Sequence, residues 1–141
     1  MKIEIRHANE EDFSWLCEVD KAAPRSWVAR TIFHGEYLIA LLDGEKRGFL
    51  RYSLFWGKVP CMDVLLIDEG FRRQGVGTVL VKEWQGEMIR KGAKILMTSA
   101  MESEPEPQAW HRRNGFRESG QLTFAGVQPT PEIFFIKELS F

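Results

Sequence analysis

Hydrophobic and polar positions along the chain follow two periods, and each period predicts one kind of element. Apolar residues at every second position, or in a short unbroken run, are typical of strands, whereas apolar residues three and four apart are typical of helices. On this basis strands are expected at 3–5, 37–42, 49–56, 62–67, 94–99, 116–124 and 132–139. Helices are expected at 10–22, from Pro24 onward, at 75–90, and from Pro105 or Pro107 to Arg113.

Several residues mark the ends of these elements. Asn9 is a good helix N-cap, and Asp12 stands where a capping-box acid reaches back to it. Pro24 suits the first turn of a helix, and Gly92 suits the left-handed residue that ends one. Asp43-Gly44 predicts a hairpin turn, and a second turn is expected from Gly57 to Pro60. The apolar side of the second helix is expected to consist of Trp27, Val28, Thr31 and Ile32.

The order of these elements predicts the fold class. A strand, two helices, three strands, a helix, a strand, a helix and two strands together indicate a mixed α+β fold. We expect a single domain over residues 1–141, with one central mixed sheet and helices on both faces. The run 62–67 is almost wholly apolar, which is typical of a strand covered on both faces.

Composition narrows the class of protein. The 141 residues carry 19 Lys+Arg against 20 Asp+Glu, a formal net charge of −1, which disfavours a nucleic-acid partner. Hydrophobic residues make up 44% and charged residues 28%, as in globular rather than disordered chains. No apolar run reaches the ~20 residues of a membrane span, and the charged N-terminus is unlike a signal peptide. A soluble cytoplasmic protein with no membrane partner is therefore expected.

The thiols and imidazoles are scattered along the chain. Cys17 and Cys61 match no metal-ligand spacing and have apolar neighbours, so we interpret both as buried thiols in a reducing compartment. His7, His34 and His111 are far apart in sequence, and no metal site is expected from them.

The strongest chemical signal is the stretch 64–77, which reads VLLIDEGFRRQGVG. A buried strand leads through a polar turn and two arginines to a G-x-G that opens an amphipathic helix. The first turn of a helix has backbone N–H groups without partners and carries partial positive charge. Gly75 and Gly77 let an anion approach those groups, and Arg72 and Arg73 add full positive charge. The pattern favours a diphosphate ligand.

Three other interpretations compete for this stretch. A P-loop requires G-x-x-x-x-G-K-[ST], which is absent. A dinucleotide fingerprint requires a third glycine where Leu80 stands and an acid near Ile95. In the third interpretation the glycines only start a helix and the arginines belong to a solvated turn.

Together with a second motif, this loop resembles the GNAT acetyltransferase superfamily. The family loop [QR]-x-x-G-x-[GA] is matched by residues 72–77, which read RRQGVG. The family segment [FY]-Y-x-x-x-G-F is matched by residues 110–116, which read WHRRNGF. The predicted order of elements fits the family fold over essentially the whole chain.

The resemblance implies that acetyl-CoA is a co-substrate, with its pyrophosphate on the backbone amides from about Arg72 to Thr78. It also implies that strand 62–67 splays from strand 94–99 and that the pantetheine arm enters the gap. A backbone N–H near Leu66 would then point at the acyl oxygen. The cofactor-binding residues implied are Leu65, Leu66, Ile67, Arg72, Arg73, Gln74, Gly75, Gly77 and Thr78.

Acetyl transfer to an amine needs a base for the ammonium and an acid for the leaving thiolate. The resemblance places a carboxylate base at Asp63, for which a strand-edge Asp without a catalytic role is the equal alternative. Glu102 is a second candidate base. His111 stands where the family commonly has a tyrosine acid, and an imidazolium could protonate the thiolate instead. Packing, or a hydrogen bond to pantetheine, is the alternative role of His111.

The expected acceptor is a primary amine of a small molecule or of a peptide. In the family, two segments wall the acceptor pocket, and here they are 22–28 and 124–132, with Phe55 and Trp56 nearby. Trp27 and Trp56 suggest an apolar or aromatic lining, although such residues are more often core residues. A rival function is an acyl-CoA sensor without turnover, and another is a protein-interaction domain. A homodimer is expected only by analogy with the family.

Overall fold

The computed structural model describes residues 1–139, and its elements follow the predicted order. The strands are β1 (Ile3–His7), β2 (Tyr37–Leu42), β3 (Glu45–Phe55), β4 (Val59–Ile67), β5 (Ile95–Met101), β6 (Arg117–Leu122) and β7 (Glu132–Glu138). The helices are α1 (Phe13–Val19), α2 (Arg25–Phe33), α3 (Val76–Arg90) and α4 (Pro105–Arg113), with short 3-10 helices η1 (Glu10–Asp12) and η2 (Glu69–Phe71).

The strands form a mixed sheet, which confirms the α+β fold class. Within the described residues the sheet has seven strands in the order β1-β2-β3-β4-β5-β7-β6. By contacts the chain divides into two compact units. The first consists of Met1–Ser53 and Val64–Trp84, and the second consists of Leu54–Asp63 and the residues from Gln85 onward. None of the helices in residues 1–139 is long and apolar enough to cross a membrane.

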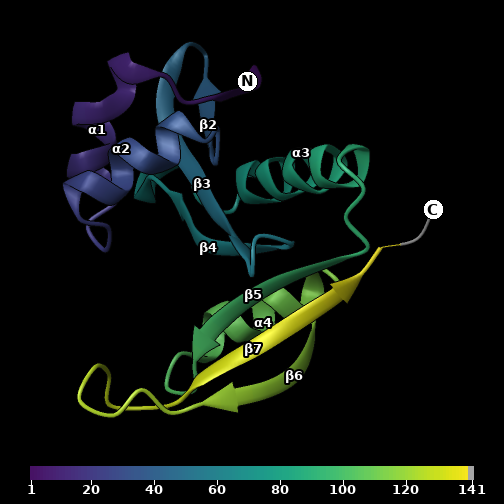
Figure 1. Cartoon of the computed structure of the whole chain (residues 1–141). Helices are drawn as coiled ribbons and strands as arrows, with labels where there is room; N and C mark the ends of the chain where they lie inside the picture. Colours follow the sequence, from purple (N-terminus) through teal and green to yellow (C-terminus); the bar gives the residue numbers. More distant parts are fainter. Residues whose placement is uncertain (140–141) are drawn as a thin grey trace. The chain divides into compact units, whose positions relative to one another are not determined.

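The first unit contains an antiparallel ladder, with α1 and α2 lying side by side (Figure 1). Ile5 of β1 lies opposite Ala40 of β2, and Leu38 of β2 lies opposite Leu50 of β3. The two helices pack their apolar residues against this ladder. The core cluster consists of five fully buried residues, Leu16, Val28, Tyr37, Ile39 and Phe49.

The predicted apolar side of α2 is correct except at one residue. Val28 and Thr31 are buried and Ile32 is half-buried, as expected from their spacing. Trp27 is 37% exposed, so its predicted place in the core is wrong. The Arg30 guanidinium lies 4.7 Å from the centre of the Trp27 ring, and this cation–π contact covers the indole instead.

The first helix is shorter than the predicted 10–22. It begins with η1, and α1 ends at Val19 because Asp20 leaves helical geometry with a ψ of 74°. The carboxylate of Asp20 accepts hydrogen bonds from Tyr37 Oη at 2.6 Å and from Arg51 Nε at 2.7 Å. These buried partners hold Asp20 away from the helical path.

The turn between β3 and β4 is tighter than predicted. Trp56 and Gly57 both adopt positive φ values, of 56° and 68°, so the chain reverses over the three residues 56–58 and β4 begins at Val59. The other predicted turn residues are confirmed, because Gly44 and Gly92 have φ values of 86° and 91°.

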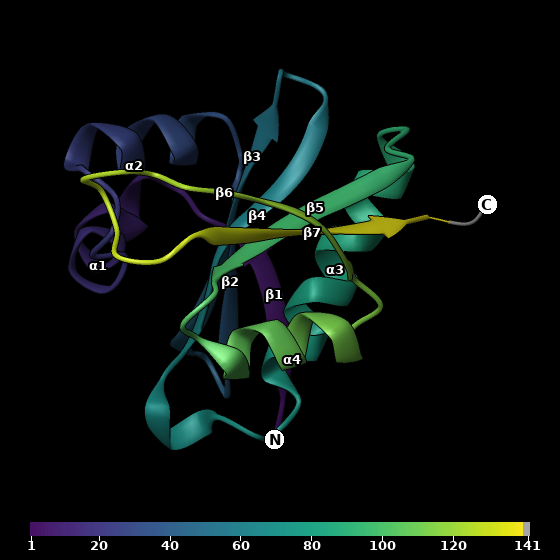
Figure 2. The ribbon, with the colours of Figure 1, turned by 90° about the horizontal axis from the view of Figure 1, so that it is seen from below.

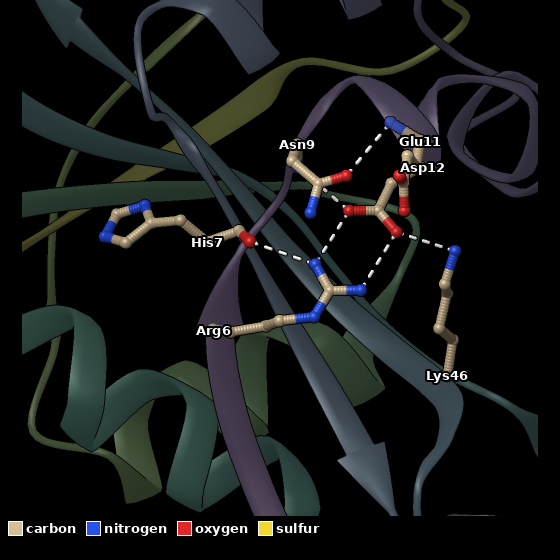
Figure 3. A network of polar contacts seen from close by, with 6 residues as sticks. All are labelled: Arg6, His7, Asn9, Glu11, Asp12 and Lys46. Carbon is tan, nitrogen blue, oxygen red and sulfur yellow. Dashed lines mark hydrogen bonds and ion pairs between the residues drawn. The ribbon is translucent and has the colours of Figure 1, made fainter.

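A buried carboxylate fixes the start of η1 (Figure 3). Asp12 is 1% exposed and accepts hydrogen bonds from both terminal nitrogens of Arg6, at 2.7 and 3.0 Å. It also accepts from the Asn9 backbone N–H at 2.8 Å, while Lys46 Nζ lies 2.6 Å from Oδ1. The Asn9 side chain accepts from the Glu11 N–H, which confirms the predicted capping box. The hydrogen bonds from Arg6, assisted by Lys46, hold the pKa of Asp12 far below its usual range.

In the second unit, α4 covers one face of the ladder formed by β5, β7 and β6 (Figures 1 and 2). Ser99 of β5 lies opposite Phe134 of β7, and Met101 lies opposite Glu132. The first part of β4 runs parallel to β5, with Cys61 opposite Met97. The core of this unit includes Leu96, Ala100, Phe116, Ile133 and Phe135. The predicted splay of 62–67 from 94–99, and the single domain over 1–141, stay predictions.

Replacing Asp12 with Asn tests the network at η1. The variant removes the charge that faces Arg6 and Lys46, so we expect the free energy of unfolding near pH 7 to fall by about 2 kcal/mol. Because folding lowers the pKa of Asp12, this stabilisation is present above the unfolded pKa of about 3.9 and is lost as the pH falls further. The difference in the free energy of unfolding between D12N and the wild type, measured by urea unfolding, should therefore be smaller near pH 2.5 than near pH 7.

Glu4→Gln is the matched control, because Glu4 forms only an exposed ion pair with Lys2 at 3.0 Å. This variant should leave the free energy of unfolding nearly unchanged. Equal losses in the two variants, or a D12N gap that does not depend on pH, would contradict the prediction.

Candidate functional site

In the first unit, the chain leaves β4 through η2 and enters α3 by an exposed loop. Arg73 and Gly75 in this loop have φ values of 63° and 84°, a left-handed conformation that suits glycine. The side chains of Arg72, Arg73 and Gln74 are exposed. The first backbone hydrogen bond of α3 runs from the Val79 N–H to the Gly75 carbonyl at 3.0 Å. The Arg72 N–H donates to the Glu69 carbonyl at 3.5 Å, so the open amides at the helix end are those from Arg73 to Thr78.

This loop can bind an anion with two adjacent negative groups. Open amides, the positive end of the helix dipole and two arginine charges occur together on one turn. Arg72 Nε donates to the Ile67 carbonyl at 2.9 Å, which ties the turn to the end of β4. The structure thus places the predicted residues Arg72, Arg73, Gln74, Gly75, Gly77 and Thr78 on one turn, directly after the strand that carries Leu65, Leu66 and Ile67.

Strand β4 lies very close to β3 beside Leu66. A Cβ atom at Gly48 would lie 2.8 Å from the Leu66 carbonyl oxygen and 2.7 Å from Ile67 Cδ1. Real Cβ atoms do not approach backbone atoms this closely, so only glycine fits at this position of β3. The Asp68 N–H donates to the Arg47 carbonyl at 2.7 Å and holds the end of β4 at the same place.

A hollow of about 520 Å³ lies beside β4 in the first unit. Its walls are the residues 18–22 at the end of α1 and the side chains of Val64 and Leu66. The lining is mostly apolar, with Glu18 and Lys21 adding charge. The sequence placed one wall of the acceptor pocket at 22–28, and of that segment this hollow includes Ala22.

Buried polar partners hold the wall of this hollow in place. Asp20 is 2% exposed, and its carboxylate binds both Tyr37 and Arg51. Burial raises the pKa of Tyr37 well above its usual range, and the hydrogen bond to Asp20 adds to this effect. The phenol therefore stays protonated and keeps donating to Asp20. The segment after α1 is fixed from within the core.

In the second unit, Asp63 is exposed on β4 and accepts a hydrogen bond from the Cys61 thiol. Burial raises the pKa of Cys61 to about 12, with further contributions from Asp63 and from the charge of Glu132. Cys61 is confirmed as a buried free thiol. Cys17 is free but only half-buried, so its predicted burial is wrong.

Glu132 ends the segment 124–132 that was predicted to wall the acceptor pocket, but sequence reasoning gave its carboxylate no role of its own. Its carboxylate accepts from Ser99 Oγ at 2.7 Å and from Gln128 Nε2 at 3.0 Å, so each oxygen has a donor. The residue lies at the start of β7 and is half-buried. The available signal was one acidic residue at the head of the apolar run IFFI.

His111 lies on α4 and is 7% exposed. Its Nε2 is 3.2 Å from the Ser99 carbonyl oxygen, which makes Nε2 the protonated nitrogen, and its Nδ1 has no hydrogen-bond partner among the described residues. The ring lies 5.4 Å from that of Phe135. Burial lowers the pKa of His111 below 6.5, although the Ser99 carbonyl and the charge of Glu132 oppose the shift. The imidazole is therefore mainly neutral at pH 7.

Other predicted site residues lie in exposed segments. Glu102 is exposed after β5, and its backbone N–H donates to the Pro131 carbonyl at 2.9 Å. Trp56 is 81% exposed at the tip of its hairpin and lies 4.7 Å from the Phe55 ring, so it is not a core residue. His7 and His34 are exposed.

Comparisons with known proteins agree on the fold. A family model described as the acetyltransferase (GNAT) family matches residues 3–116. Ard1 from Thermoplasma volcanium has a TM-score of 0.88 at 14% identity over 100% of both chains. A GNAT family acetyltransferase from Elizabethkingia anophelis with acetyl-CoA bound has a TM-score of 0.76 at 18% identity, over 97% of this chain and 98% of that one. The ribosomal-protein-S18-alanine N-acetyltransferase from Escherichia coli has a TM-score of 0.81 at 15% identity, over 99% and 96%. No curated protein matches the chain.

Gly48→Ala tests the close approach of β3 and β4. The added methyl group would meet the Leu66 carbonyl, which cannot turn away as a side chain can, so one strand must shift. We expect the free energy of unfolding to fall by about 1–3 kcal/mol, measured by urea unfolding. Gly70→Ala is the control, because a Cβ at Gly70 meets nothing within 4 Å. Equal stability of the two variants would contradict the prediction.

Proposed function

The chain belongs to the acetyltransferase (GNAT) family, and from this we propose that it is an N-acetyltransferase. In this proposal, the acetyl group of acetyl-CoA moves to a primary amine of a small molecule or peptide. The amine attacks the thioester directly, in a complex that holds both substrates.

The observation that carries the proposal is the turn at 72–78. Its open amides and the Arg72 and Arg73 side chains suit the pyrophosphate of acetyl-CoA, which carries two linked negative groups. Gly75 and Gly77 keep side-chain atoms away from those amides. Leu65, Leu66 and Ile67, on the strand before the turn, are the proposed contacts of the pantetheine arm.

Two residues have proposed roles in the transfer of the acetyl group, Asp63 as the base and Leu66 as a hydrogen-bond donor. When bound, acetyl-CoA supplies a thioester with an electrophilic carbonyl carbon. Asp63 takes a proton from the acceptor ammonium, and the nitrogen lone pair then forms a bond to that carbon. The Leu66 N–H donates to the carbonyl oxygen as it becomes negative. Collapse of the intermediate breaks the C–S bond and releases the CoA thiolate.

Direct attack is favoured over an acetylated cysteine. A cysteine nucleophile reacts as the thiolate, and the pKa of Cys61, about 12, keeps it protonated near neutral pH. The protonated thiol also donates a hydrogen bond to Asp63, and this hydrogen bond orients the carboxylate. Cys61 therefore supports the proposed base and does not carry the acetyl group.

His111 is better suited to positioning than to acid catalysis. Its ring is neutral at pH 7, and its N–H is engaged by the Ser99 carbonyl. We therefore propose that it holds α4 against β5, and that a water molecule passes the second proton of the attacking nitrogen to the CoA thiolate. The same observation favours a second candidate function, an acyl-CoA sensor without turnover. A cytoplasmic location and a homodimer stay predictions from the sequence.

Ligand binding and turnover test the proposed function together. We expect acetyl-CoA at ~100 times its dissociation constant to add ~2.7 kcal/mol of stability in a thermal shift assay, and ATP and NAD to add little. Release of CoA thiol with a panel of primary amines should separate the enzyme from the sensor, because a sensor binds acetyl-CoA but releases no thiol.

Arg72→Ala and Arg73→Ala should each weaken acetyl-CoA binding about tenfold.

The control for the arginine variants is Arg90→Ala, an exposed arginine in the last turn of α3. Its affinity for acetyl-CoA should equal that of the wild type. A wild-type protein that does not respond to acetyl-CoA, or arginine variants of unchanged affinity, would refute the proposed phosphate site.

The pH dependence of turnover tests the role of His111. Because burial lowers its pKa, the imidazolium form is lost as the pH rises through a value below 6.5. In an enzyme that depends on this acid, kcat would keep falling at every pH above that value. We propose no such acid role, so we expect kcat not to fall between about pH 6.5 and about pH 8.5. A limb present in the wild type and absent in His111→Gln, which keeps an N–H donor, would restore the acid role.

A further inference from the structure

We propose that Glu132 binds the ammonium group of the acceptor, and that the acceptor is consequently a cationic primary amine without a carboxylate beside its nitrogen. This inference rests on the proposed function and specifies its substrate class. Four observations in the second unit carry it.

The carboxylate of Glu132 is held in place but not neutralised. Ser99 Oγ and Gln128 Nε2 bind its two oxygens, and both donors are uncharged. Gln128 is itself fixed, because the same Nε2 donates to the Thr130 carbonyl at 2.9 Å. Among the described residues no lysine or arginine forms an ion pair with Glu132, so its negative charge is available to a ligand.

The two fully buried carboxylates among the described residues behave differently. Asp12 faces Arg6 and Lys46, and Asp20 faces Arg51. Those acids are structural, since each has its counter-charge within the protein. Removing a carboxylate from water is costly unless a positive group approaches it. Glu132 lacks that group in the protein alone, and a cationic ligand would provide it.

A second carboxylate lies in the neighbourhood of Glu132. Asp63 accepts a hydrogen bond from the Cys61 thiol, and the charge of Glu132 also raises the pKa of that thiol. Asp63 is the proposed base, and Glu132 is then placed to hold the ammonium while Asp63 accepts its proton. Two acids at one place also repel an acceptor that carries its own carboxylate next to the amine.

His111 fixes the residue that orients this carboxylate. Its Nε2 donates to the Ser99 carbonyl, and the Ser99 hydroxyl donates to Glu132. The His111 ring packs against Phe135, whereas Ser99 lies opposite the neighbouring Phe134, so the imidazole and the Ser99 hydroxyl lie on opposite faces of the ladder. The three N–H donors of a bound ammonium are therefore left to the Glu132 carboxylate.

Steady-state kinetics of thiol release test this inference. The probes are alaninamide and leucinamide, each compared with its free amino acid. We expect the wild type to prefer each amide at least tenfold in kcat/KM. Glu132→Gln keeps the side-chain shape but removes the charge, so the KM for the amides should rise at least tenfold, with kcat and acetyl-CoA affinity within about twofold. Glu132→Asp keeps the charge, so its KM should lie between those of E132Q and the wild type.

The matched control is Glu138→Gln, the same change on the same strand, where the carboxylate forms an exposed ion pair with Arg117. Its kinetics and thermal stability should equal those of the wild type. Any of three results would overturn the inference. These are an unchanged KM in E132Q, a preference of the wild type for free amino acids, and a variant in which a higher KM is matched by an equal fall in kcat and in acetyl-CoA affinity. Failure of the proposed function is distinct, because the wild type itself would then release no thiol with any amine in the panel.

Discussion

Strand β4 approaches β3 so closely at Gly48 that only a hydrogen atom fits opposite the Leu66 carbonyl. This contact fixes the strand that leads into the proposed phosphate-binding turn. Arg72 then extends the constraint, because its Nε binds the Ile67 carbonyl at the last residue of β4. The position of the open amides before Val79 therefore depends on how two strands pack, several residues earlier in the chain.

The carboxylates of this protein have roles that follow from their partners. Asp12 and Asp20 are buried, face arginine or lysine, and stabilise η1 and the segment after α1. Glu132 is bound by a hydroxyl and an amide, both of them uncharged. Neutral donors orient a carboxylate without cancelling its charge. The same functional group is thus structural in the first unit and suited to ligand binding in the second.

Local rules predicted much of the fold. The Asn9–Asp12 capping box, the hairpin at Asp43-Gly44 and the end of α3 at Gly92 depend on neighbouring residues only, and each is confirmed. Long-range effects were not predictable in this way. Ser99 and Glu132 are 33 residues apart, and their hydrogen bond depends on the register between β5 and β7. The neutral state of His111 likewise depends on the burial of its ring against Phe116 and Phe135, which a sequence motif does not report.

The protonated state of Cys61 has a consequence for life under oxidative stress. Hydrogen peroxide attacks cysteine thiolates, and at a pKa of about 12 roughly one Cys61 in 10⁵ is ionised near pH 7. The protein can therefore keep a sulfur atom beside its proposed catalytic carboxylate without offering peroxide a target there. Sulfenic acid formation at this position would first require the surrounding strands to open.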